Sequence, residues 1–220
     1  MFKALIEILR KSDLLQEAYT LSVGMLKLDR EMYIAAYKSL RSSDTGEMKL
    51  NIYEQDAKIN AAQRDIRRKV LAHLVASPSR DIVFGLVLTS IIIDIERIGD
   101  YTKNIVELAE KHPLKLHGGS FEEDFLEIEK YVSERFDRLI EAFEKSDVEL
   151  ATMVMRRHRE ITQKCDHILN TLLSVDMGDQ SCPDRLALGL YTRYLKRIAS
   201  HLTNIASGIV NPFDRIGFKE

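Results

Sequence analysis

Residues 91–109 read IIIDIERIGDYTKNIVELA, and this stretch carries the clearest structural signal in the chain. At about 100° per residue its side chains separate into two faces. The apolar face, which we expect to pack in a core, holds Ile91, Ile95, Ile98, Thr102 and Ile105. The opposite face holds Glu96, Asp100, Asn104 and Glu107, with Gly99 at its edge. The pattern predicts an amphipathic helix with its acids on the surface of a helical bundle.

Two carboxylates, Glu96 and Asp100, stand one helical turn apart on the outer face. Like charges at this spacing repel by roughly 0.2–0.5 kcal/mol in an isolated helix. Such a pair is either a solvated face or a place where a cation binds. The outward position argues against a buried carboxylate di-metal core, which also needs inward Glu-x-x-His motifs that the sequence lacks.

The rest of the chain also reads at a helical period, and no convincing alternating strand is found. We predict a short leading helix over residues 2–11, followed by six longer helices. The longer helices are expected over residues 13–42, 46–76, 79–111, 121–145, 147–175 and 184–209. Two capping boxes, Ser120 with Glu123 and Ser146 with Glu149, support the fourth and fifth boundaries. The sequence predicts an all-α fold of two tandem antiparallel three-helix bundles, over residues 1–112 and 120–220.

Composition excludes several functional classes. The chain has 220 residues, 45% of them hydrophobic and 30% charged, with a net charge of −2, so no bulk charge attracts nucleic acid. The longest apolar run, residues 82–93, is too short to cross a bilayer. Two cysteines without zinc-like spacing favour a reduced, cytoplasmic protein. No phosphate-binding loop, HExxH or nucleophile elbow is present, so we do not expect an enzyme.

The second half of the chain contains a weaker copy of the opening stretch. When Arg97 is aligned with Arg197, the isoleucine that follows and the asparagine seven residues on coincide in both halves. In the preceding helix, Ile59 aligns with Ile161 and the Asp56 position becomes His158. These matches favour a tandem duplication. Because both arginines recur between core positions, we expect each to form a salt bridge between helices.

The preceding helix brings further oxygen donors. Asp56 and Asn60 lie on one side of its apolar stripe and are expected alongside Glu96 and Asp100. Oxygen donors suit hard cations better than the sulfur and nitrogen donors of zinc-type sites do.

Three segments resemble the signature of the PhoU proteins. They are DIERIGDYTKNIVELA (94–109), YEQDAKINAAQRDI (53–66) and, in the second half, RYLKRIASHLTNIA (193–206). The first combines a Glu-x-x-x-Asp with Arg, Gly and Asn at fixed offsets, and the resemblance covers nearly the whole chain.

The resemblance implies a cytoplasmic regulator of phosphate uptake and of the phosphate-starvation response. Its partners would be the ATPase of a phosphate transporter or a membrane sensor kinase. The protein would then be peripheral to the membrane, held there by these partners. Whether it forms a homodimer is left open. Metal would bind at Asp56, Glu96 and Asp100, with Asn60 and Asn104 as neighbours. Iron is the first expectation, with Mn, Mg, Zn and Ni as alternatives.

The second half departs from the family pattern at each ligand position. His158, Lys196 and Ser200 stand where Asp56, Glu96 and Asp100 stand in the first half. A lysine brings positive charge to the place where a cation would bind, so we predict that the second site is lost.

Two alternatives belong to other functional classes. One is a metal-free helical adaptor that pairs with a membrane protein of the sodium–phosphate cotransporter type, its acidic face being only solvated. The other is a metal-dependent hydrolase, which is disfavoured because no paired nucleophile and base is found.

Overall fold

The computed structural model describes residues 13–43, 50–76, 81–112, 114–174 and 182–217. Within these ranges there is no strand, which confirms the all-α class. The long helices are α2 (Asp13–Ser42), α3 (Ile52–Ala76), α4 (Ile82–Lys111), α5 (Glu122–Lys145), α6 (Val148–Met155), α7 (His158–Leu173) and α8 (Cys182–Val210). Two 3₁₀ turns, Gly119–Phe121 and Phe213–Arg215, flank the second half. The leading helix expected over residues 2–11 lies outside the described residues.

The helix predicted over residues 147–175 is broken into α6 and α7. The break lies at Arg156 and Arg157, and Arg157 has a φ of 59°, in the left-handed region. Periodicity did not reveal it because the buried positions Val154, His158 and Ile161 keep a helical spacing across the break.

The structure contradicts both predicted capping boxes. Phe121 occupies the N-cap position of α5, without a side-chain cap. Asp147, not Ser146, caps α6, where its carboxylate accepts from the backbone N–H groups of Glu149 (2.9 Å) and Leu150 (3.1 Å).

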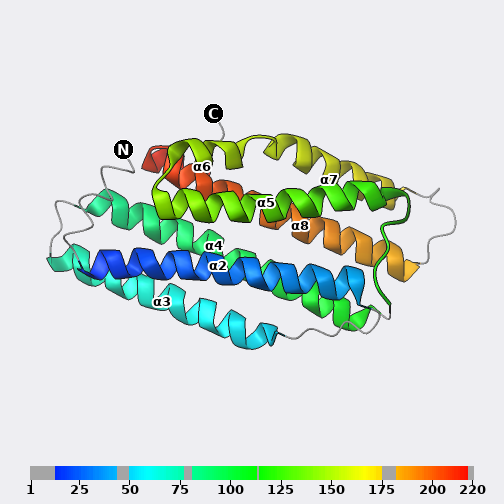
Figure 1. Cartoon of the computed structure of the whole chain (residues 1–220), viewed down its shortest axis with the longest axis horizontal. Coiled ribbons are helices and arrows are strands. Elements are labelled where there is room, and N and C mark those ends of the chain that lie inside the picture. Colours follow the sequence, from blue (N-terminus) through cyan, green and yellow to red (C-terminus); the bar gives the residue numbers. More distant parts are fainter. Residues whose placement is uncertain (1–12, 44–49, 77–80, 113, 175–181, 218–220) are drawn as a thin grey trace.

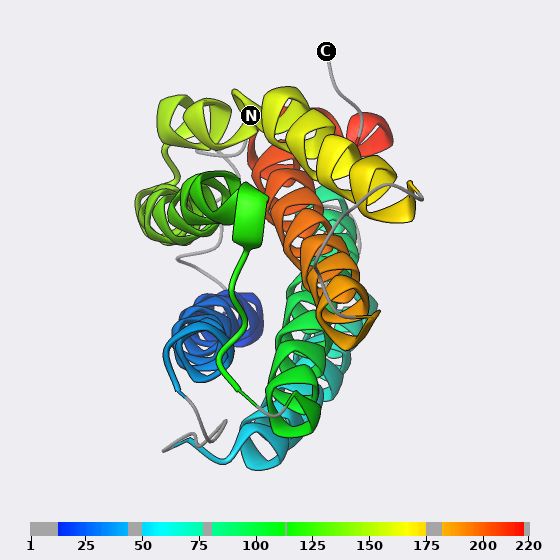
Figure 2. The same ribbon diagram turned by 90° about the vertical axis from the view of Figure 1, so that its right-hand side faces the viewer.

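The helices form two bundles that lie side by side (Figure 1). Helices α2, α3 and α4 pack on one another in the first, and α5, α6, α7 and α8 form the second. Figure 2 shows α4 and α8 adjacent in the middle of the molecule, with α2 and α3 on one side and α5, α6 and α7 on the other. Contacts between α4 and α8, and between α2 and α5, join the bundles, and the buried apolar side chains of both halves form one continuous core.

The junction between the halves is tightly packed at α4 and α8. A Cβ added at Gly208 of α8 would lie 2.7 Å from Cγ2 of Ile91 on α4, so the two helices approach more closely there than any side chain would allow. Glycine at this position therefore permits the approach.

A buried polar cluster joins α2, α5 and α8 at the same junction. Glu129 of α5 accepts from Nε of Arg41 (2.9 Å) and from the hydroxyl of Tyr191 (2.7 Å). Burial raises the pKa of Glu129, and the attraction of Arg41 does not fully offset it. The halves are thus held together by apolar packing, and a desolvated ion pair links them at the junction.

Candidate functional site

The structure brings Asp56 of α3 and Asp100 of α4 together through a lysine. The ammonium of Lys103, on α4, lies 3.0 Å from Oδ2 of Asp56 and 3.4 Å from Oδ1 of Asp100. The side chains of Asp56, Glu96 and Asp100 are 15%, 16% and 29% exposed. The predicted acids therefore lie half-buried between two helices, rather than on a fully solvated outer face.

Positive side chains of α4 neutralise part of this acidic cluster. Arg97 pairs with Asp100 (3.0 Å) and lies 3.7 Å from Glu96. Burial alone would lower the pKa of Lys103, but its hydrogen bond and attraction to Asp56 raise that pKa overall. Burial, followed by repulsion from Asp100, raises the pKa of Glu96. The nearby positive charges therefore do not fully offset the burial of Glu96 and its repulsion from Asp100.

A fourth acid, Asp29 of α2, lies behind the predicted three. Its side chain is fully buried, and neither carboxylate oxygen has a hydrogen-bond partner among the described residues. Oδ1 would lie 3.1 Å from a Cβ added at Gly99, which places Asp29 against the back of the carboxylate helix. Burial, and then repulsion from Asp56, Glu96 and Asp100, raises its pKa well above the ordinary aspartate value.

The two predicted neighbours differ in their contacts. Asn60 donates from Nδ2 to Oδ2 of Asp56 (3.3 Å), so it belongs to the cluster. Asn104 is half-buried, and no hydrogen bond joins its side chain to the acids in the described part of the chain.

The donors fit a hard cation in chemistry but are not already gathered around one. All the acids offer oxygen, and Asp29 supplies a buried carboxyl group that receives no hydrogen bond from any described residue. Yet among the residues that the structure describes, no three His, Cys, Asp or Glu side chains are grouped so that they could hold a metal ion. The space between Asp56 and Asp100 is taken by Lys103, which a cation would have to displace.

The corresponding positions of the second half have other partners. Lys196 pairs with Asp166 of α7, and the hydroxyl of Ser200 donates to the carbonyl of Lys196 (2.9 Å). Nδ1 of His158 lies 3.1 Å from Oγ1 of Thr203. That the second site is lost stays a prediction.

Among the described residues, the two recurring arginines do not form the expected inter-helix salt bridges. Arg97 pairs with Glu96 and Asp100 of its own helix. Arg197 of α8 does reach another helix, but its Nε donates to the hydroxyl of Tyr101 (3.1 Å), not to an acid. His201 stacks on the Tyr101 ring and lies 2.6 Å from Asp94 of α4. This face of the second signature helix is used to bind the first half.

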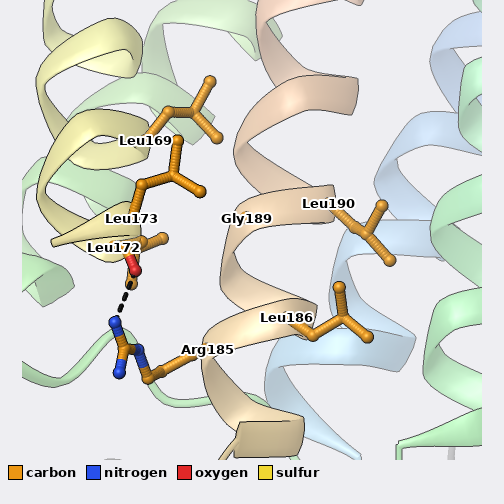
Figure 3. Close-up of a pocket in the computed structure, with 7 residues that line it drawn as sticks. All are labelled: Leu169, Leu172, Leu173, Arg185, Leu186, Gly189 and Leu190. Atoms are coloured by element: carbon orange, nitrogen blue, oxygen red, sulfur yellow. Dashed lines mark hydrogen bonds between the residues drawn. The ribbon is translucent and has the colours of Figure 1, made fainter. Parts of the chain in front are cut away.

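An apolar pocket of about 450 Å³ lies between the end of α7 and the start of α8 (Figure 3). Leucines 169, 172, 173, 186 and 190 line most of it. Its one charged residue, Arg185, donates to the carbonyls of Leu172 and Ser174 (2.7 Å each). Apart from this arginine, the described lining of the pocket is apolar, which does not suit a metal or an anion.

Two joined helical bundles with matching signature helices define the class of protein: a tandem repeat of one helical domain. The family model of the PhoU domain matches residues 23–109 and again 125–209. The chain belongs to the PhoU domain family.

Similar proteins agree with this assignment. Over 158 residues the chain is 29% identical to the phosphate-specific transport system accessory protein PhoU homolog of Caulobacter vibrioides, covering 69% of this chain and 67% of that protein. The fold matches the crystal structure of PhoU from Pseudomonas aeruginosa with a TM-score of 0.77, at 22% identity, over 95% of this chain and 97% of the other. PhoU of Streptococcus pneumoniae, a phosphate transport system regulatory protein, also gives 0.77, at 23% identity, over 89% and 92%.

No helix in the described ranges is both long and apolar enough to pass through a bilayer.

Proposed function

We propose that this protein is a cytoplasmic, non-catalytic regulator of phosphate transport and phosphate-starvation signalling that acts by contact with other proteins. The observation that carries the proposal is the double PhoU-domain match, which covers both signature helices. The relative from Caulobacter is named as an accessory protein of a phosphate-specific transport system, and this supports the same role. The proposed partners are the transporter's ATPase and a membrane sensor kinase.

We further propose one metal site, formed by Asp56, Glu96 and Asp100 with Asn60 beside them. A bound cation would supply the positive charge that Lys103 now provides between α3 and α4. The acids would then hold these two helices in a fixed relation, and Lys103 would be released toward solvent. The shape of the surface formed by α3 and α4 would therefore depend on whether the cation is bound. Iron is the proposed ion, and the oxygen donors also suit Mn and Mg.

The regulatory role is tested in a strain that lacks the gene. We expect phosphate uptake and a phosphate-starvation reporter to lose their repression in phosphate-rich medium, and the wild-type gene to restore it. Pull-down from a phosphate-replete lysate should recover the transporter's ATPase or the sensor kinase. Normal repression in the deletion strain would refute the proposal. Recovery of a sodium–phosphate cotransporter instead would favour the adaptor alternative.

The metal site is tested by replacing Glu96 and Asp100 together with alanine. We expect the double variant to lose metal retained through anaerobic purification, because the α4 donors to the cation are gone. Metal content measured by elemental analysis decides the matter. The matched control is Glu107→Ala, a half-buried acid of the same helix that forms no hydrogen bond or ion pair with the cluster in the described part of the chain. Equal metal in wild-type and double variant would show the assignment to be wrong.

A further inference from the structure

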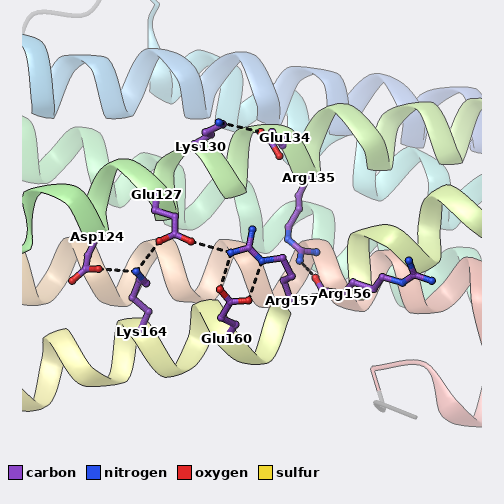
Figure 4. Close-up of polar contacts among 9 residues, drawn as sticks. All are labelled: Asp124, Glu127, Lys130, Glu134, Arg135, Arg156, Arg157, Glu160 and Lys164. Atoms are coloured by element: carbon purple, nitrogen blue, oxygen red, sulfur yellow. Dashed lines mark hydrogen bonds and ion pairs between the residues drawn. The ribbon is translucent and has the colours of Figure 1, made fainter.

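A polar pocket lies in the second half of the molecule, where the break between α6 and α7 meets α5 (Figure 4). Its volume is about 280 Å³. Four arginines and one glutamate line it together with one tyrosine and one methionine: Arg135, Arg138, Arg156, Arg157, Glu134, Tyr131 and Met153. None of the carboxylates of the proposed metal site contributes to it.

Arg135 is the unusual member of this group because it is buried and forms no ion pair with any described residue. Its side chain is only 4% exposed, and its guanidinium lies 3.6 Å above the ring centre of Tyr131. Nη2 donates to the carbonyl of Arg156, but Nε and Nη1 have no hydrogen-bond partner in the described part of the chain. The buried hydroxyl of Tyr131 has none either. Burial lowers the pKa of Arg135 to about 10. No described carboxylate forms an ion pair with this guanidinium, and the attraction of Glu134 only partly offsets its burial.

The nearby acids are already committed to other cations. Glu134, which lines the pocket, lies 3.5 Å from Arg138 and 4.0 Å from Lys130. Glu127 and Glu160 both bind Arg157. Figure 4 shows this network running along one side of the break, with Arg135 and Arg156 beyond its end. The exposed guanidinium of Arg156 forms no ion pair with any described residue.

The backbone contributes to the same arrangement. Because Arg157 adopts a φ of 59°, the chain turns sharply and α7 starts at the next residue. The start of a 16-residue helix carries partial positive charge. This adds to the positive charge of the arginines, although it would not define a site by itself.

We propose that this pocket binds an oxyanion of the phosphate type. Arginine forks match the oxygens of a tetrahedral anion in pairs, and Arg138 and Arg156 are exposed enough to receive one. The charge of the anion would offset the buried guanidinium of Arg135. The source is either free inorganic phosphate or a phosphoryl group on a side chain of a partner protein. The site is formed by α5, α6 and α7, so it stands or falls independently of the metal site and of the proposed regulatory role.

The test is isothermal titration calorimetry of chelator-treated protein in a buffer free of phosphate and sulfate. Inorganic phosphate and O-phosphoserine are titrated separately. We expect saturable binding of one anion per chain. The double variant R138Q/R156Q should bind at least about tenfold more weakly, since it loses charge-assisted hydrogen bonds. The matched control is R159Q, which removes an exposed arginine of α7 that lies outside the pocket; its affinity should equal that of the wild-type protein.

The source of the anion follows from the relative affinities. Tighter binding of inorganic phosphate indicates the free ion, and tighter binding of O-phosphoserine indicates a phosphorylated partner. Absence of saturable binding at millimolar concentrations of both would overturn the proposal. An equal loss in R159Q would do so as well, because the attraction would then be nonspecific.

Two further measurements test whether the anion binds at this pocket or elsewhere on the protein. The variant E96A/D100A should keep the wild-type affinity for phosphate; a loss there would place the anion at the carboxylates and overturn the assignment to this pocket. Phosphate should also raise the thermal midpoint of the wild-type protein but not that of R138Q/R156Q. If both midpoints rise equally, the pocket is not the binding site.

Discussion

At the scale of single residues, Lys103 sets the properties of the proposed metal site. Its ammonium bridges Asp56 and Asp100, in the place that a cation would take. The side chain is 22% exposed, so water screens these ion pairs only partly. Any incoming metal ion must compete with this internal cation.

We therefore predict that Lys103→Gln increases the affinity for Mn²⁺ by roughly tenfold, because the competing charge is removed. The metal-free variant should also melt at a lower temperature, since the acids then repel one another. Equilibrium dialysis and thermal melts with and without Mn²⁺ measure both effects. Lys58→Gln, which removes an exposed lysine of α3 paired with Glu54, is the control. Weaker Mn²⁺ binding by Lys103→Gln would contradict this role.

Cys165 of α7 allows a second prediction at this scale. The side chain is fully buried, and burial raises the pKa of its thiol to about 12. At pH 8 only about one thiol in ten thousand is then ionised, and the thiolate is the reactive form.

In a Cys182→Ser variant, where Cys165 is the remaining thiol, a colorimetric thiol reagent should not react with the native protein over hours. Full reaction is expected after unfolding in guanidinium. Prompt modification of the native variant would rule out the inert, structural role that burial assigns to this cysteine.

The candidate site could be predicted from the sequence only in part. Glu96 and Asp100 were found because they share one helix face, and the structure places Asp56 near them. Lys103 was missed because its ion pair to Asp56 depends on how α3 packs on α4. Asp29 was also missed, although a signal existed: it falls on the apolar stripe of its helix between Leu26 and Tyr33, both buried. A charged residue at a core position was the signal.

At the scale of the elements, two glycines of α8 are predicted to respond to the same substitution with opposite signs. A Cβ at Gly208 would meet Ile91 of α4 at 2.7 Å, whereas a Cβ at Gly189 would have no atom within 4 Å. Gly208→Ala should lower the free energy of unfolding by about 1–2 kcal/mol through overpacking. Gly189→Ala should raise it by about 0.5–1 kcal/mol, because alanine favours a helix interior.

Urea unfolding of both variants checks the pair, and each serves as the control for the other. A stabilising Gly208→Ala would mean that α4 and α8 do not approach as closely as the structure shows.

Helix identity followed from periodicity, but helix continuity did not. The stripe of α6 and α7 stays in phase across Arg156 and Arg157, so the pattern alone indicated one helix. The turn takes up only two residues, and the apolar side chains after it lie on the same face as those before it. The spacing of apolar residues therefore does not reveal the break. The pocket that we assign to an oxyanion arises at this break, and it was for that reason absent from the sequence-based expectations.

At the scale of the whole molecule, Glu129 links the stability of the joined halves to pH. Burial raises its folded-state pKa above that of the unfolded chain. The folded protein therefore binds this proton more tightly than the unfolded chain does. The stabilising contribution is fully present below the unfolded pKa and is lost as the pH rises through the folded pKa.

We predict that the free energy of unfolding of Glu129→Gln, relative to wild type, increases as the pH is raised from 4 toward neutrality and then levels off. The side-chain oxygen of glutamine can still accept from Arg41 and Tyr191, so packing is largely kept. Denaturant unfolding at a series of pH values gives the difference directly. The same charge change at the exposed Glu123 of α5 is the control. A difference that is flat or falls with pH would show that attraction to Arg41, rather than burial, dominates at Glu129.

Helix α4 contacts α3 on one side and α8 on the other, and the two sets of contacts lie close together along the helix. Glu96 and Asp100 face α3, while Ile91 touches Gly208 of α8 with no room for another atom. Helix α4 is therefore packed against helices of both bundles, and no free space separates it from α8 at Gly208. A displacement of α4 caused at the acids would therefore be transmitted to α8 as a rigid movement. The second bundle, which has Lys196 and Ser200 at the matching positions, would then respond to events at the metal site that we propose in the first bundle.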